Sequence, residues 1–303
     1  MGQPATTIQI DDFHVPVELK SYSLTGGTVG RIGGVRMEIV PGANGTALGR
    51  CYQQVPLHIV PPFALHSART ALFYLQNPTN GIMDGDAHLL DITARSGTFA
   101  MLTSQSATRI HPAVNSFATQ QWRIHVESGA VLVVLPGPAI PFRGCRFYQE
   151  IRVSLEPQAG LIWGDLWLAG RYARGALSEQ HVFDCIIQDL CVERERTPVF
   201  RDRFCWRGPW DRSASQWHVG GKPASASIFV SAPQSILPPP LAGAASFPTG
   251  ANDTCLRLVG DTENCIAFLV QTAFAAANAI AGRDLFTVHD ANLAPVHWFS
   301  VAE

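Results

Sequence analysis

The feature that most constrains the fold is a long succession of short segments with strand character. In "QQWRIHV", Trp122, Ile124 and Val126 alternate with polar residues, so apolar and polar side chains fall on opposite faces. Glycine- and proline-rich turns such as "ESGA" and "LPGPAIP" separate the segments. This pattern predicts a mostly β protein, built as an elongated stack or sandwich of antiparallel sheets with one or two helices. The segments are residues 34–40, 70–76, 87–93, 97–103, 120–126, 130–135, 148–155, 161–169, 181–193 and 197–204.

One region departs from the strand pattern and has helical periodicity. Apolar residues recur at helical spacing through residues 261–282. Asp261 or Thr262 is placed to cap the start of this helix, and Gly282 is placed to end it. We expect a helix near the C-terminal end, reached through a connection at residues 233–250 that is rich in proline, alanine and glycine.

Composition and short motifs argue against nucleic-acid binding, secretion and a membrane span. The 22 basic and 24 acidic residues form no basic run, which argues against nucleic-acid binding. Charged residues are only 15% of the chain, so much of the surface is expected to be weakly polar and covered by partners. The start lacks the pattern of a secretory signal, polar residues interrupt the apolar helix, and the seven cysteines include no CxxC. We expect one cytoplasmic domain over residues 1–303, with reduced thiols and no membrane span.

The loop "NPTNGIMDGDAH", residues 77–88, combines turn residues with ionisable ones. Its Asn-Gly and Asp-Gly pairs are typical of turns, and turn chemistry alone favours a structural role. A functional role requires Asp84, Asp86 and His88 to point the same way, and a strand that begins at Gly85 would place the last two on one face. Carboxylate and imidazole suit nickel, cobalt or zinc, and so few ligands predict a transient metal site.

Two further segments carry polar residues with alternative interpretations. In "ATRIHP", a histidine before proline is more typical of a strand end that makes one hydrogen bond than of a ligand. In "LAGRYARGALSEQH", the charged residues form either a solvated turn or a loop fixed by an arginine buried against a carboxylate. The residues concerned are Arg109, His111, Arg171, Arg174, Glu179 and His181.

The segment "DRFCWRGPWDRSASQW" is rich in tryptophan and arginine, the residues that anchor protein interfaces. Trp206, Arg207 and Trp210 are therefore candidates for binding a partner, although the rings are equally suited to pinning an irregular segment to the core. The common catalytic and nucleotide-binding signatures, GxSxG, the P-loop, HExxH and GxGxxG, are missing from the sequence.

Four stretches taken in order resemble the urease accessory protein D family (UreD, also called UreH). They are "LQNPTNGIMDGDAHLLDI", "LTSQSATRIHP", "VESGAVLVVLPGPAIPFRGCRFYQ" and "GDLWLAGRYARG", and the resemblance covers roughly residues 70–210. Two positions depart from the family pattern. Asp84 adds a carboxylate where the family often has glycine, and Ala176 replaces the glutamate expected after "ARG", for which Glu179 is a possible substitute.

This resemblance implies a maturation factor that is not an enzyme. Such proteins are strand-rich scaffolds that bind apo-urease and the F and G accessory proteins, of which G is the GTPase. Nickel would pass through an internal channel, so the resemblance implies nickel in transit and no tightly bound cofactor. Weak ligands that are spaced apart suit a conduit better than a closed tetrahedral site does. The residues assigned to this path are Asp84, Asp86, His88, His111, Glu179 and His181, with Gly85, Arg109, Arg171 and Arg174 as loop-shaping residues.

Two alternatives remain at this level. A β-rich metal-dependent hydrolase or transferase would use Asp84, Asp86 and His88 and would bind metal tightly at a pocket of convergent titratable groups. A pure interaction module would use the tryptophan and arginine segment and would have no role with metal.

Overall fold

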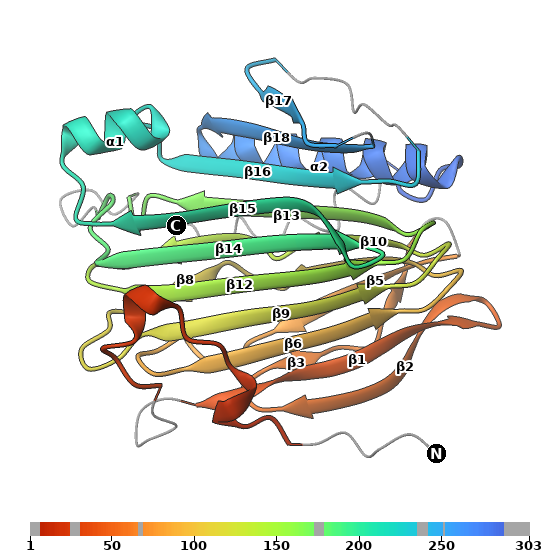
Figure 1. The fold of residues 1–303 in the computed structure, drawn as a ribbon, viewed down its shortest axis with the longest axis horizontal. Helices are drawn as coiled ribbons and strands as arrows, with labels where there is room; N and C mark the ends of the chain where they lie inside the picture. Colours follow the sequence, from red (N-terminus) through yellow and green to blue (C-terminus); the bar gives the residue numbers. More distant parts are fainter. Residues whose placement is uncertain are drawn as a thin grey trace.

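Two β-sheets pack face to face in the computed structural model of the chain, and a long helix lies along the second sheet (Figure 1). The prediction of a mostly β fold with one or two helices, one of them near the C-terminal end, is confirmed, and the described residues contain two α-helices. The structure describes residues 7–24, 31–65, 69–172, 179–234, 242–250 and 252–287.

The first sheet, sheet A, has seven strands. In spatial order they are β15 (Thr197–Arg207), β14 (Cys185–Arg194), β12 (Arg146–Leu155), β9 (Ala118–Val126), β6 (Ala87–Ala94), β1 (Ile32–Gly42) and β2 (Gly45–Gln54). The second, sheet B, has eleven strands, of which eight form a continuous path. These are β17 (Ala245–Pro248), β18 (Asp253–Gly260), β16 (Ala224–Ser231), β13 (Gly160–Leu168), β10 (Val131–Leu135), β7 (Phe99–Ser104), β5 (Thr70–Gln76) and β3 (His58–Ile59), with β4 (Phe63–Ala64), β8 (Thr108–Ile110) and β11 (Pro138–Pro141) beside it.

The central strands of both sheets are parallel, which corrects the expectation of antiparallel sheets. From β5 to β14 the chain alternates between the sheets, so that each coil adds one strand to each sheet in the same direction. Antiparallel pairs occur where the chain turns back within one sheet, as in β14 with β15 and β13 with β16. The sequence did not distinguish these arrangements because side chains alternate with period two in both kinds of sheet.

Helix α2 (Thr262–Ala281) lies within the predicted range 261–282. Asp261 occupies the N-cap position, and Gly282 ends the helix in the left-handed conformation with φ of 62°. By length and composition α2 is apolar enough to cross a membrane, yet 56% of that stretch is buried, as in the core helix of a globular protein. The predicted connection at 233–250 contains the edge strand β17, and residues 235–241 of it lie outside the described part.

Residues 7–24 cross the outer face of sheet A, where two glutamine side chains hold their backbone (Figure 1). The Gln121 side chain accepts a hydrogen bond from the His14 amide and donates one to the His14 carbonyl. The Gln54 side chain makes the same pair of bonds to Ile8. This segment contains two short 3-10 helices, Ile10–Asp12 and Val17–Leu19, while the remaining helix, α1 (Arg212–Val219), follows β15.

The alternation of faces along β12 gives a direct test of the two-sheet core. Ile151 is fully buried between the sheets, whereas Ser154 on the same strand is exposed. Ile151→Ala is expected to lower the free energy of unfolding by about 2–5 kcal/mol because it leaves a cavity. Ser154→Ala is the matched control and should change it by less than about 0.5 kcal/mol. Urea unfolding measures both, and equal effects would contradict the assigned faces.

Candidate functional site

A row of polar side chains, one on each of four neighbouring strands, crosses the face of sheet A that is turned to sheet B. His88, Gln120, Gln149 and Gln188 are direct neighbours in register on β6, β9, β12 and β14. All four are buried. Two residues further along each strand, the side chains on the same face are Leu90, Trp122, Ile151 and Leu190, which belong to the apolar core between the sheets. His88, Gln120, Gln149 and Gln188, together with Asp165, are called the polar layer below.

Asp165 joins the polar layer from sheet B. Its Oδ2 atom accepts hydrogen bonds from Trp163 Nε1 at 2.6 Å and from Gln188 Nε2 at 2.8 Å. Trp167 Nε1 donates to Gln188 Oε1 at 2.8 Å, so Gln188 binds two side chains of the opposite sheet. Burial raises the pKa of Asp165 to about 7, and the two donated hydrogen bonds only partly offset this effect.

His88 is the other ionisable member of the polar layer. Its side chain is fully buried, and neither ring nitrogen has a hydrogen-bond partner among the described residues. Nε2 lies 3.9 Å from Asp86 Oδ2. Burial lowers the pKa of His88, against the opposing effect of Asp86, so the ring is neutral at pH 7 and keeps a nitrogen lone pair.

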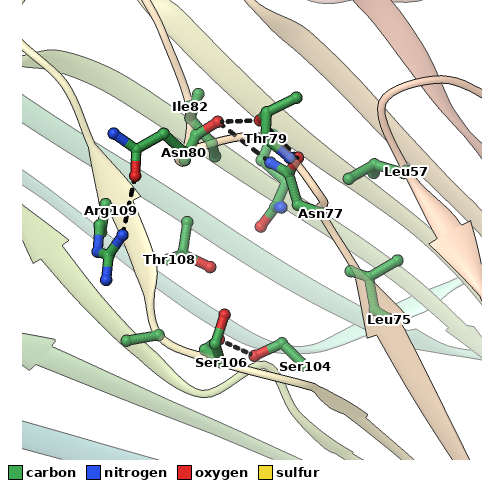
Figure 2. Close-up of a pocket in the computed structure, with 13 residues that line it drawn as sticks. Leu57, Leu75, Asn77, Thr79, Asn80, Ile82, Ser104, Ser106, Thr108 and Arg109 are labelled. Carbon is green, nitrogen blue, oxygen red and sulfur yellow. Dashed lines mark hydrogen bonds between the residues drawn. The ribbon is translucent and has the colours of Figure 1, made fainter. Parts of the chain in front are cut away.

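Two cavities adjoin the polar layer. The outer cavity has a volume of about 130 Å³ and lies under the 77–82 loop (Figure 2). The inner cavity, of about 20 Å³, is lined by Gln149 and Asp165 among others and has room for one water-sized species. Thr108 and Gln120 line both cavities, so the two adjoin. The two cavities therefore lie one behind the other between a surface loop and the Asp165 carboxyl, with Thr108 and Gln120 in the wall between them.

The carboxylates predicted in the 77–88 loop hold the backbone of that region. Asp84 accepts hydrogen bonds from the amides of residues 114–116, at 2.8–3.0 Å. Asp86 Oδ1 accepts from the Arg31 amide and Oδ2 from the Met83 amide, both at 2.8 Å. Gly85 takes a φ of 81°, the left-handed conformation expected for its turn. These bonds account for the turn chemistry seen in the sequence.

The other predicted residues are engaged in separate contacts. His111 Nε2 donates to the Asn80 carbonyl at 2.8 Å, and Arg109 Nη1 donates to Asn80 Oδ1 at 2.9 Å. Glu179 accepts two hydrogen bonds from Arg171, which lower the pKa of this carboxyl. The structure thus has the arginine–carboxylate pair considered for this loop. His181 stacks on Trp210 at 5.0 Å between ring centroids, and Arg174 lies outside the described residues.

Of the predicted nickel path, the described structure pairs Asp86 with His88 but gathers no larger group. Within the described ranges, no three His, Cys, Asp or Glu side chains are grouped so as to hold a metal ion. Asp86 and His88 lie together, with 3.9 Å between Oδ2 and Nε2, whereas Asp84 turns to the amides of residues 114–116 and does not join them. This geometry disfavours a tightly bound catalytic metal at Asp84, Asp86 and His88.

The tryptophan-rich segment is anchored mainly in the core. Trp210 is buried, and its Nε1 donates to the Arg207 carbonyl at 2.9 Å. Trp206 stacks on Phe204 with ring centroids 4.2 Å apart. Arg207 is exposed, as is Trp217 of α1, with 85% of its surface accessible. Of the three residues predicted to bind partners, Arg207 is the one that the fold leaves open to solvent.

Most of the polar layer was missed by sequence reasoning. The available signal was Asp165, a carboxylate inside the apolar run "LIWGDLWLA". In such a run an acidic residue is buried and requires donors, which predicts hydrogen-bond partners on a neighbouring element. The three glutamines carry no comparable signal, because their alignment depends on how the parallel strands are registered.

The raised pKa of Asp165 predicts a pH-dependent stability. Between about pH 4 and about pH 7 the folded chain keeps a proton that the unfolded chain has lost, since the ordinary pKa is 3.8. The stabilising contribution of Asp165 is therefore full below this window and declines through it. Asp165→Asn removes the titration, so its stability relative to wild type should rise with pH by up to about 1.4 kcal/mol per unit. Urea unfolding at several pH values tests this, and a constant difference would contradict it.

Comparison with known proteins identifies relatives over most of the chain. A family model described as UreD urease accessory protein matches residues 32–284. The chain is 30% identical to urease accessory protein UreD 2 of Streptomyces griseus over 174 residues, which cover 57% of this chain and 58% of that protein. It is 32% identical to urease accessory protein UreD of Deinococcus radiodurans over 185 residues, which cover 60% and 65%. It is 33% identical to urease accessory protein UreD of Sporosarcina pasteurii over 175 residues, which cover 55% of this chain and 68% of that protein.

The aligned part spans less than two thirds of the length of the first two of these relatives. The family match is longer and runs from β1 to beyond the end of α2, so it includes every strand that contributes to the polar layer. It also extends the resemblance seen in residues 70–210 to both sides. The chain therefore belongs to the UreD urease accessory protein family.

Proposed function

We propose that this chain is a urease maturation factor that helps to deliver nickel into apo-urease and has no catalytic turnover of its own. It acts in the cytoplasm within a complex that contains the F and G accessory proteins, of which G is the GTPase. Nickel is its cargo and is held only in transit. The observation that carries this proposal is the family match over residues 32–284.

The polar layer provides chemistry that suits a divalent cation in transit. Asp165 lines the inner cavity, and its Oδ1 atom accepts no hydrogen bond from the described residues. Because its pKa is raised to about 7, the carboxyl exchanges a proton for a cation at little cost near neutral pH. One free carboxylate oxygen binds nickel weakly, which allows the ion to leave again.

The neutral imidazole of His88 is a second donor of the borderline type that nickel accepts. His88 belongs to the polar layer on β6 of sheet A, whereas Asp165 is on β13 of sheet B. Within sheet A, His88 is two strands away from Gln149, which lines the inner cavity with Asp165. Donors that are spaced in this way favour passage over retention. We therefore assign the transit role to Asp165 and His88, and the loop carboxylates Asp84 and Asp86 to holding the backbone around them.

A host that carries the cognate urease operon tests the proposal. Deleting this gene should leave full-length urease that lacks nickel and activity, and the wild-type gene should restore both. Asp165→Asn should restore nickel per urease several-fold less well than wild type, because the amide cannot exchange a proton for a cation. Nickel is measured by elemental analysis of purified urease, with activity assayed in parallel.

Asp253→Asn is the matched control, since Asp253 is also buried but bonds Ser231 outside the polar layer. Both variants must accumulate to the wild-type level for the comparison to hold. Normal nickel content in the deletion strain would refute the maturation role. Equal restoration by Asp165→Asn and wild type would refute the transit role of Asp165 while leaving the maturation role intact.

Arg207 tests the predicted partner surface without disturbing the core. Arg207→Ala should reduce co-purification of the F protein and apo-urease several-fold while leaving the thermal unfolding transition unchanged, because Arg207 is exposed. Arg50→Ala, on the exposed side of β2, is the matched control. Undiminished co-purification with Arg207→Ala would remove this residue from the partner surface.

A further inference from the structure

In the loop that covers the outer cavity, the side-chain oxygens of Asn77 and Asn80 and the carbonyl of Gly81 are engaged in internal hydrogen bonds. Asn77 Oδ1 accepts from the Thr79 amide at 3.1 Å and the Thr79 hydroxyl at 2.6 Å. The Gly81 carbonyl accepts from Asn77 Nδ2 at 3.2 Å and lies 2.8 Å from the Thr79 hydroxyl, whose single proton is shared between this carbonyl and Asn77 Oδ1. Asn80 Oδ1 accepts from Arg109 at 2.9 Å. The loop therefore presents few free lone pairs to the cavity.

The same is true at the inner end, where the cavity reaches the polar layer. Gln120 Oε1 accepts from Trp122 Nε1 at 3.2 Å and from Gln149 Nε2 at 3.4 Å. Its amide group, Nε2, donates to no acceptor among the described residues, although Gln120 lines the cavity and is only 6% exposed. A nearly buried N–H donor is thus left to be satisfied by whatever occupies the cavity.

Further donors surround this space. The hydroxyls of Ser106 and Thr108 have no hydrogen-bond partner within the described ranges, and both residues line the cavity (Figure 2). Arg109 uses one terminal nitrogen for Asn80 and makes no ion pair with a described carboxylate. None of the described residues that line the outer cavity is acidic. The cavity therefore combines one positive charge with several unused donors, which is the environment that an anion requires.

Size limits the class of anion. The volume of about 130 Å³ is several times that of the inner cavity, which has room for one water-sized species, so the outer cavity accommodates a small ion of a few heavy atoms. Oxyanions accept several hydrogen bonds at once, and a guanidinium can bind two of their oxygens side by side.

We propose that the outer cavity is a binding site for a small oxyanion of the carboxylate or phosphate class. Arg109 binds the charge at the mouth, and Ser106, Thr108 and Gln120 donate to the oxygens deeper in the cavity. This site adjoins the inner cavity of Asp165 and shares Thr108 and Gln120 with it, but its existence does not depend on nickel delivery.

Thermal unfolding of the full chain in the presence of acetate or inorganic phosphate tests the proposal. A ligand that binds only the folded chain raises the midpoint in a saturable way, so titrations at constant ionic strength, with chloride as the reference salt, give an apparent Kd. Both oxyanions should raise the midpoint for wild type above the chloride reference. Thr108→Val should weaken binding by about tenfold, because it keeps the side-chain shape and removes one donor.

Arg109→Gln should abolish the oxyanion effect, while Arg212→Gln, which removes an exposed arginine on α1, should leave it unchanged. Arg109→Gln also loses the bond to Asn80, but Thr108→Val breaks no hydrogen bond of the described structure, so a loss in that variant is not explained by misfolding. An absent oxyanion effect, or the same effect in wild type, Thr108→Val and Arg109→Gln, would overturn the proposal. Either result would leave the nickel measurements on Asp165→Asn unaffected.

Discussion

The hydrogen bonds that Gln188 makes with Asp165 and Trp167 couple the two sheets at a level where the core is not apolar. A carboxyl and an amide buried between sheets are costly unless each finds partners there. Gln188 meets this requirement from sheet A by donating to Asp165 and accepting from Trp167, both of sheet B. A shift of either strand by one residue would turn these side chains to the wrong face, so the polar contacts specify the register that the apolar core alone fixes less strictly.

Local sequence patterns predicted the elements of this fold better than their arrangement. The strand segments and the helix at 261–282 follow from alternation, helical spacing and end residues such as Gly282, which act over a few neighbouring positions. Parallel pairing does not follow from such patterns, because β9 contacts β6 and β12 through coils of chain that pass by way of the other sheet. The short turns were consistent with hairpins as well as with crossings between sheets.

The candidate site shows the same division between local and distant information. The Asp-Gly turn chemistry around Gly85 was predicted from adjacent residues, and the structure places Asp84 and Asp86 as acceptors for backbone amides. His88 was singled out because it follows that loop, and the structure shows it as a buried ring without a hydrogen-bond partner among the described residues. Its alignment with Gln120, by contrast, is a property of strand pairing, which no short motif encodes.

The coiled path of the chain has a consequence for the order in which the protein is made. Each strand of the polar layer in sheet A comes from a different coil, so the layer is complete only after β14 has been synthesised and has docked on β12. Asp165 precedes Gln188 by 23 residues, so in a growing chain Trp163 is available before the second of its two described donors. Partial chains therefore end in an open parallel edge beside an incompletely bonded carboxyl. Such edges associate readily, which makes this stage of synthesis the one at which the chain most needs protection from aggregation.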